Sequence, residues 1–189
     1  MPCTDSSASV VYLSLETRRT AFEVGGWYPE KLGVSVAIAL TSNRLHIFTE
    51  KDIGKLAALL AAAECVIGYN VVDFDFKVLA GCRGANLENV RCLDLMKNIE
   101  SAAGRRVSLG SLRTATLKTA QVSNGLENVQ LWKKRQIAKV IEDCCNTVLA
   151  IKALHEYGRD HDELFYSRDN GPRRKRIKVN WDHPKREQA

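Results

Sequence analysis

The order of β-rich and helical patterns is the feature that most restricts how this chain can fold. Three β-rich runs lie near the N-terminus, at residues 10–15, Val34–Leu40 and Leu45–Phe48. The last two flank the turn residues 41–43, which predicts an antiparallel hairpin. Residues 65–69 form a short, bounded apolar run, typical of a buried central strand. Strand and helix patterns alternate after it, so we expect an α/β domain with a mixed sheet.

The helix signals are more local. Thr49 is the expected N-cap of the first helix, with Asp52 in the acidic position of a capping box. Apolar spacing predicts a long helix over 134–157, and Gly158 is its expected C-terminal cap. A further strand is expected at 89–95, leading into a helix that ends near residue 104. Shorter helices are expected at 74–79, 108–116 and 126–132.

Length and composition fit one globular domain. The 189 residues are 45% hydrophobic and 26% charged, with a formal net charge of +6. No apolar run reaches the roughly 18–20 residues that a membrane span needs, and no secretory signal begins the chain. We therefore expect a cytoplasmic protein that does not bind a membrane. Six cysteines lack zinc-ligand spacing and are expected as thiols. We expect disorder at 1–8, the domain at 9–166 and a basic segment at 167–189.

Three separated segments carry the polar residues that could do chemistry. Ser14 and Glu16, near the end of the first strand, project to the same face because strand residues two apart do so. Residues 68–76 follow a buried strand into a helix and contain Asp75. Residues 141–148 belong to the long helix, where Asp143 and Thr147 are four residues apart and share one face.

These segments together resemble the DnaQ-like DEDD exonucleases, and within them a bacterial group often found with, or fused to, helicases. The first strand of that group typically reads Phe-Asp-Leu-Glu-Thr, and here it reads Leu-Ser-Leu-Glu-Thr. The remaining matches, in order, are Gly-Gly-Trp at 25–27, Lys-x-Gly-x-Ser-Val-Ala at 31–37, Gly-x-Asn-x-x-x-Phe-Asp at 68–75, Leu-Asp-Leu at 93–95, Ser-Leu-x-x-Leu at 108–112, Gly-Leu at 125–126 with Trp132, and Trp181. The resemblance implies a ribonuclease-H-like fold, in which a mixed central sheet is flanked by helices.

The family's 3′–5′ exonuclease chemistry uses four carboxylates that hold two Mg²⁺ or Mn²⁺ ions, because these hard ions prefer charged oxygen ligands. Carried over by position, the resemblance retains Glu16 and Asp75 but places Ser14 and Thr147 where the family has its first and last Asp. Asp143 stands where a Tyr or His orients the attacking water. We therefore expect a catalytically impaired homologue with weak or absent metal binding at Glu16 and Asp75. The alternative is a divergent metal-dependent exonuclease that uses Glu16, Asp75 and Asp143.

The expected partner is single-stranded DNA or RNA, a helicase, or another nucleic-acid-processing protein; oligomeric state does not follow from the sequence. Arg18 and Arg19 follow the first strand, at the rim where the family admits its substrate strand, and Tyr69 and Asn70 lie in the middle motif. Near the C-terminus lies a basic run, which comprises Arg173, Arg174, Lys175 and Arg176. A basic patch attracts a phosphate backbone, so this run could bind nucleic acid; the alternative is a solvated tail.

Overall fold

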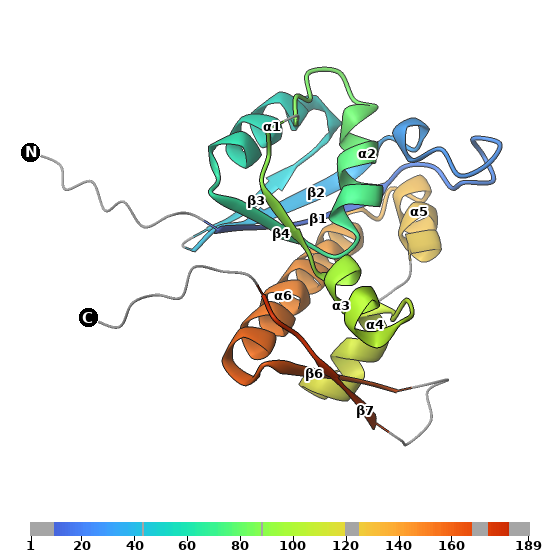
Figure 1. The fold of residues 1–189 in the computed structure, drawn as a ribbon. Helices are drawn as coiled ribbons and strands as arrows, with labels where there is room; N and C mark the ends of the chain where they lie inside the picture. The colour runs from blue at the N-terminus through green and yellow to red at the C-terminus, as the bar shows by residue number, and fades with distance from the viewer. Residues whose placement is uncertain (1–9, 43, 88, 120–124, 168–173, 182–189) are drawn as a thin grey trace, which may run out of the picture. The chain divides into compact units, whose positions relative to one another are not determined.

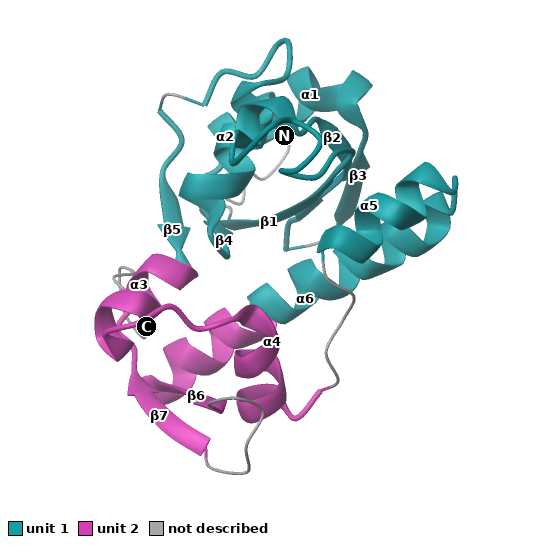
Figure 2. Ribbon diagram, turned by 90° about the vertical axis from the view of Figure 1, so that its right-hand side faces the viewer, with its two compact units in different colours: residues 1–94, 122–152 teal, residues 95–121, 153–189 magenta. Residues whose placement is uncertain are grey.

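The computed structural model describes residues 10–42, 44–87, 89–119, 125–167 and 174–181. They belong to two compact units, coloured separately in Figure 2. Unit 1 comprises Met1–Asp94 and Val122–Lys152, and unit 2 comprises Leu95–Gln121 and Ala153–Ala189. Within the described residues, no helix is long and apolar enough to cross a membrane.

A five-stranded sheet in the order β3-β2-β1-β4-β5 forms the centre of unit 1 (Figure 1). The hairpin strands β2 and β3 run antiparallel beside β1, whereas β4 and β5 extend the sheet on its other side as parallel strands. The predicted mixed sheet is therefore confirmed. The strands are β1 Val10–Thr17, β2 Val34–Leu40, β3 Leu45–Phe48, β4 Cys65–Gly68 and β5 Cys92–Asp94.

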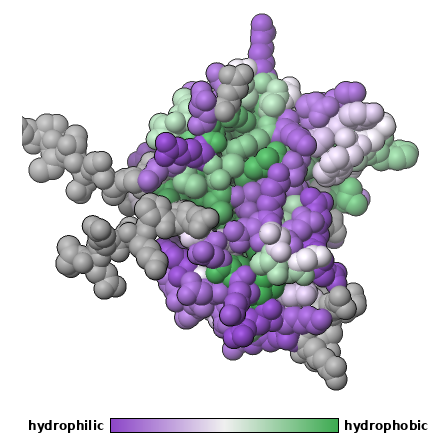
Figure 3. Space-filling model, viewed as in Figure 1, coloured by the Kyte–Doolittle hydropathy of each residue, from purple (hydrophilic) through white to green (hydrophobic). Residues whose placement is uncertain are grey.

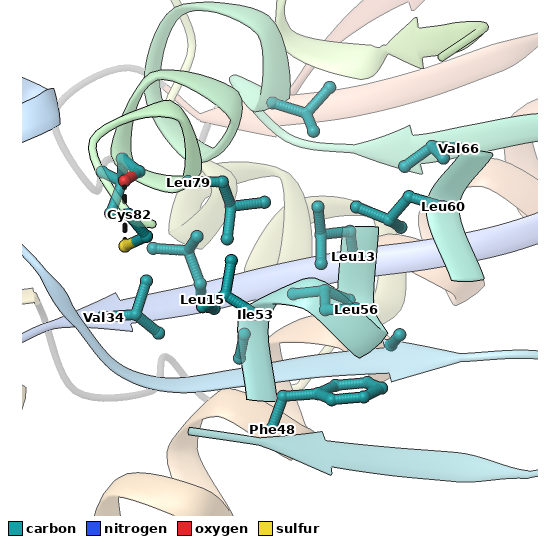
Figure 4. Close-up of a cluster of buried hydrophobic side chains, with 14 of the residues drawn as sticks. Leu13, Leu15, Val34, Phe48, Ile53, Leu56, Leu60, Val66, Leu79 and Cys82 are labelled. Carbon is teal, nitrogen blue, oxygen red and sulfur yellow. Dashed lines mark hydrogen bonds between the residues drawn. The ribbon is translucent and has the colours of Figure 1, made fainter. Parts of the chain in front are cut away.

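The alternation of side chains along β1 separates the core of unit 1 from its polar site. Leu13 and Leu15 point into an apolar cluster with α1 and α2, shown in Figure 4. Ser14 and Glu16 point to the opposite face, where the Cys144 thiol bonds to the Ser14 carbonyl oxygen and α5 lies against β1. The helices of this unit are α1 Ile53–Ala62, α2 Phe76–Ala80, α5 Gly125–Lys133 and the first part of α6 Ile137–His161.

Unit 2 pairs two strands with short helices. Its elements are α3 Leu95–Ala103, α4 Leu109–Leu112, a π-helical turn Arg113–Leu117, the end of α6, β6 Glu163–Ser167 and β7 Arg174–Lys178. The Thr116 hydroxyl oxygen both donates to and accepts from the backbone of Phe165, at 2.8 Å in each direction. Ser111 bonds to the backbone of Ser167 in the same way. The sequence patterns did not predict β6 and β7.

Several expected helix ends need correction. The long helix begins at Ile137 rather than at residue 134, because Arg135 takes the left-handed conformation. The helix expected over 108–116 is α-helical only over Leu109–Leu112.

The α-helix α1 begins at Ile53, after a 3-10 turn at Glu50–Asp52, because the Thr49 hydroxyl donates to the Asp52 carboxylate rather than capping backbone amides. Helix α6 continues through Gly158 to His161.

Gly158 serves packing rather than capping. A Cβ there would lie 2.4 Å from Nε1 of Trp181, so only glycine leaves room for the indole ring. The Trp181 indole N–H donates to the His155 carbonyl oxygen at 3.0 Å, and the Trp181 side chain is buried. The helix instead ends at Asp162, which takes the left-handed conformation with φ 56° and donates its N–H to the Gly158 carbonyl.

Candidate functional site

Glu16 lies half-buried near the end of β1, beside α5 and α6. The Asn128 side chain, almost fully buried in α5, hydrogen-bonds to the Glu16 carboxyl group. The pKa of Glu16 is raised from 4.5 to about 7, mainly by burial; the hydrogen bond from Asn128 opposes the shift, and the negative charge of Asp143 adds to it. The site therefore holds Glu16 at a pKa where its charge changes near neutral pH.

Asp75 comes from the turn that follows β4, and only 4% of its surface is exposed. Burial raises its pKa well above the ordinary range, with further contributions from the charges of Asp94 and Glu16. A hydrogen bond from the backbone of Leu15 works in the opposite direction. The two carboxyl groups that the family resemblance retains, Glu16 and Asp75, are thus brought close enough to interact.

The turn that carries Asp75 is fixed by a third carboxylate, Asp94, at the end of β5. Its two oxygens accept the backbone N–H groups of Asn70, at 2.9 Å, and Val72, at 3.1 Å. Asn70 has φ 66°, a left-handed conformation that asparagine tolerates better than most residues. In the sequence Asp94 stands out only as part of the Leu-Asp-Leu motif, because it lies 24 positions after Asn70 and no local pattern links the two.

The α6 side of the site has one acid and two groups without formal charge. Asp143 is half-buried and interacts electrostatically with Glu16. One turn later, the Thr147 hydroxyl donates to the Asp143 carbonyl oxygen at 2.9 Å, within its own helix. Cys144 is fully buried, and burial raises the pKa of its thiol well above 9. The thiol therefore stays protonated, and it packs α6 against β1 through its bond to the Ser14 carbonyl, at 3.4 Å.

These residues do not fit a pair of divalent ions. The resemblance to the DEDD exonucleases would place the first and last acids of a four-carboxylate set at Ser14 and Thr147, and the Thr147 hydroxyl is directed to a backbone carbonyl. Across the described parts of the chain, no group of three or more His, Cys, Asp and Glu side chains is arranged to hold a metal ion.

The residues expected to contact nucleic acid differ in how exposed they are and in whether they already have a partner. Arg18 pairs with Glu50 and lies over the Trp132 ring, 5.3 Å from its centroid. Arg19 is exposed beside it, and Tyr69 is half-buried. The Asn70 Oδ1 atom is buried without a hydrogen-bond partner.

The basic run lies in β7 of unit 2, apart from Arg173, which is outside the described residues. Arg174, Lys175 and Arg176 are exposed, and Figure 3 shows a hydrophilic surface over β7. The Arg174 guanidinium lies over Phe165, 4.4 Å from the ring centroid, and Arg176 pairs with Glu163 at 3.4 Å. The part of the run that the structure describes is therefore an ordered strand edge.

The sheet has an antiparallel hairpin on one side of β1 and two parallel strands on the other, with helices on both faces. This arrangement is a ribonuclease-H-like α/β fold. Among solved structures, the chain is similar to the family B DNA polymerase of the hyperthermophilic archaeon Pyrobaculum calidifontis. The TM-score is 0.62 at 17% identity, over 80% of this chain and 24% of that chain.

Two structures of Escherichia coli exonuclease I also match over 82% of this chain at 12% identity. They are the zinc-bound form of its complex with single-stranded DNA, with a TM-score of 0.49, and its complex with a dA16 oligonucleotide, with a TM-score of 0.46. The matches span 41% and 44% of those chains, so less than half of each of these structures corresponds to this protein. No family model and no curated protein sequence matches. The similarity to the polymerase, at a TM-score of 0.62, supports the fold, and a fold alone does not fix a function.

Proposed function

We propose that this protein is a catalytically impaired homologue of the DEDD exonucleases that binds single-stranded nucleic acid or a nucleic-acid-processing partner. The donor set of the site carries the proposal. Glu16 and Asp75 remain, but serine and threonine stand at the two other acidic positions, which leaves too little negative charge for two dications.

Several polar groups of the site also bond to one another, although the buried Oδ1 atom of Asn128 has no hydrogen-bond partner among the described residues. Glu16 bonds to Asn128, and Asp75 accepts from the backbone of Leu15. Thr147 donates to the carbonyl of Asp143. A buried polar group without a partner costs about 1–3 kcal/mol, so these bonds offset part of the cost of burying the two carboxyl groups.

The alternative is a divergent exonuclease that uses Mg²⁺ or Mn²⁺. One observation favours it: Asp143 is close enough to Glu16 to raise the pKa of that carboxyl group, so a third acid does lie at the site. Against it, Asp143 lies one helical turn, about 5.4 Å, before the position at which the family carries its last acid.

The test of catalysis uses purified full-length protein and labelled single-stranded DNA and RNA, each with Mg²⁺ or Mn²⁺. We expect no hydrolysis by the wild-type protein. Metal-dependent hydrolysis that Glu16→Gln and Asp75→Asn both abolish would establish the alternative. A third protein, Ser14→Asp with Thr147→Asp, restores both carboxylates at the family's positions, and Mn²⁺-dependent cleavage by it alone would support loss of an ancestral site.

The nucleic-acid part of the proposal rests on the exposed basic residues of β7. Deleting the C-terminal segment is a poor test, because Trp181 and the strand itself are packed into unit 2. Replacing Arg174, Lys175 and Arg176 by Gln leaves the apolar side chain of Ile177 in place. We expect weaker binding and a shallower salt dependence, measured by fluorescence anisotropy. In this proposal the protein acts in the cytoplasm, beside a helicase or a similar partner.

A further inference from the structure

Unit 1 has a surface hollow of about 490 Å³ lined by basic and aromatic side chains. The lining residues are Arg18, Trp132, Lys133, Arg135 and Ile137. They come from three places: the end of β1, the end of α5 and the start of α6. Guanidinium and ammonium groups bind phosphate, while an indole ring and an isoleucine offer apolar contact to a sugar or base.

Two of the three positive charges already have acidic partners. Arg18 pairs with Glu50 and also lies over the ring of Trp132. Lys133 pairs with Glu23. No described residue forms an ion pair with Arg135, so its charge remains available to a ligand in the hollow.

The backbone of Arg135 adds a second, independent observation. Its N–H donates to the Trp132 carbonyl at 2.9 Å, and the N–H of Gln136 donates to the Leu131 carbonyl at 2.9 Å. This pair of bonds is the Schellman motif, in which the residue after the helix is left-handed and is usually glycine. Arg135 takes that conformation with φ 57°. An arginine at a position that suits glycine is unfavourable for folding, so a substitution there can separate the effect of the side chain from that of the backbone.

We infer that this hollow binds a phosphate group of a single-stranded nucleic acid, with Arg135 as the main contact. The inference rests on the proposed function and deepens it, because it assigns the binding to a site on unit 1 that is separate from the basic run of β7. Arg18 and Lys133, each already paired with an acid, add one guanidinium and one ammonium group to the lining. Trp132 and Ile137 form the wall against which the adjacent sugar or base packs.

Arg135→Gly tests the inference because it separates binding from folding. It removes the charge and places the preferred residue at the left-handed position, so the melting temperature should stay the same or rise. Binding of a labelled oligothymidylate, measured by anisotropy, should weaken about tenfold, and the salt dependence should fall by roughly one phosphate contact. Arg135→Gln should weaken binding similarly. Arg83→Gln is the matched control, since exposed Arg83 does not line the hollow.

The outcomes separate the two ideas. If wild-type protein binds and both Arg135 variants bind as tightly as Arg83→Gln, the hollow is not the site and the inference is overturned. Loss of binding only in the β7 variant would then leave the proposed function intact. If wild-type protein binds no oligonucleotide, the inference and the nucleic-acid part of the proposed function both fail. Metal-dependent hydrolysis that persists in Arg135→Gly contradicts the proposed function alone.

Discussion

Replacing Glu16 with Gln should make the protein more stable at neutral and alkaline pH. The folded protein holds the pKa of this carboxyl group at about 7, against 4.5 in the unfolded chain. Folding therefore disfavours the charged form. The penalty is absent below about pH 4.5, grows between pH 4.5 and 7, and is constant above that range. At about 1.36 kcal/mol for each pKa unit, it amounts to about 3 kcal/mol. Gln removes the penalty and keeps an oxygen that can accept the bond from Asn128.

Urea unfolding of the wild-type and variant proteins at several pH values measures this effect. Near pH 8 the Gln variant should be more stable by about 3 kcal/mol, and near pH 4 the two should agree within about 0.5 kcal/mol. Glu30→Gln, which removes the same charge from an exposed position, is the control and should change stability little at any pH. A Gln variant no more stable than wild type near pH 8 would refute the reasoning. Stabilisation of wild type by Mn²⁺, absent in the variant, would instead reveal a working metal ligand.

Three further substitutions test the packing and hydrogen bonding of the two units. Gly158→Ala should destabilise the protein by about 1–3 kcal/mol, because its Cβ overlaps the Trp181 ring, whereas Gly54→Ala in α1 meets open space and should stabilise by up to about 1 kcal/mol. Thermal melts of the two variants should shift in opposite directions, and parallel shifts would contradict the packing argument. Asp94→Asn should cost about 1–2 kcal/mol, because a neutral amide replaces the carboxylate that accepts two backbone N–H groups; an unchanged urea midpoint would show that those bonds contribute little.

Much of the fold could be predicted because it follows from local pattern. The hairpin, the buried strand 65–69 and the long helix can each be predicted from the pattern of apolar residues within one segment of the sequence. The β6–β7 pair was missed because its outer strand is almost entirely charged, so no alternation of apolar residues marks it. Only Ile177 of β7 is buried, and its partner in β6 is Leu164, 13 residues away along the chain.

The sequence also placed the acidic residues of the site, but not the groups that support them. Spacing puts Ser14 and Glu16 on one face of a strand, and Asp143 and Thr147 on one face of a helix. Asn128 gave no such signal. Its role depends on α5 lying against β1, a contact between segments more than a hundred residues apart.

By itself, the sequence determined which chemical groups exist: two retained carboxylates, a serine and a threonine at the other two positions, and a mixed sheet with helices to carry them. Only the tertiary structure decided their properties. Burial raises the pKa of Glu16 and Asp75, because a carboxylate that loses contact with water loses the hydration that stabilises its charge. The structure likewise decided that Gly158 is there for the ring of Trp181 and that Arg135 lines a hollow, since both depend on segments that the fold alone brings together.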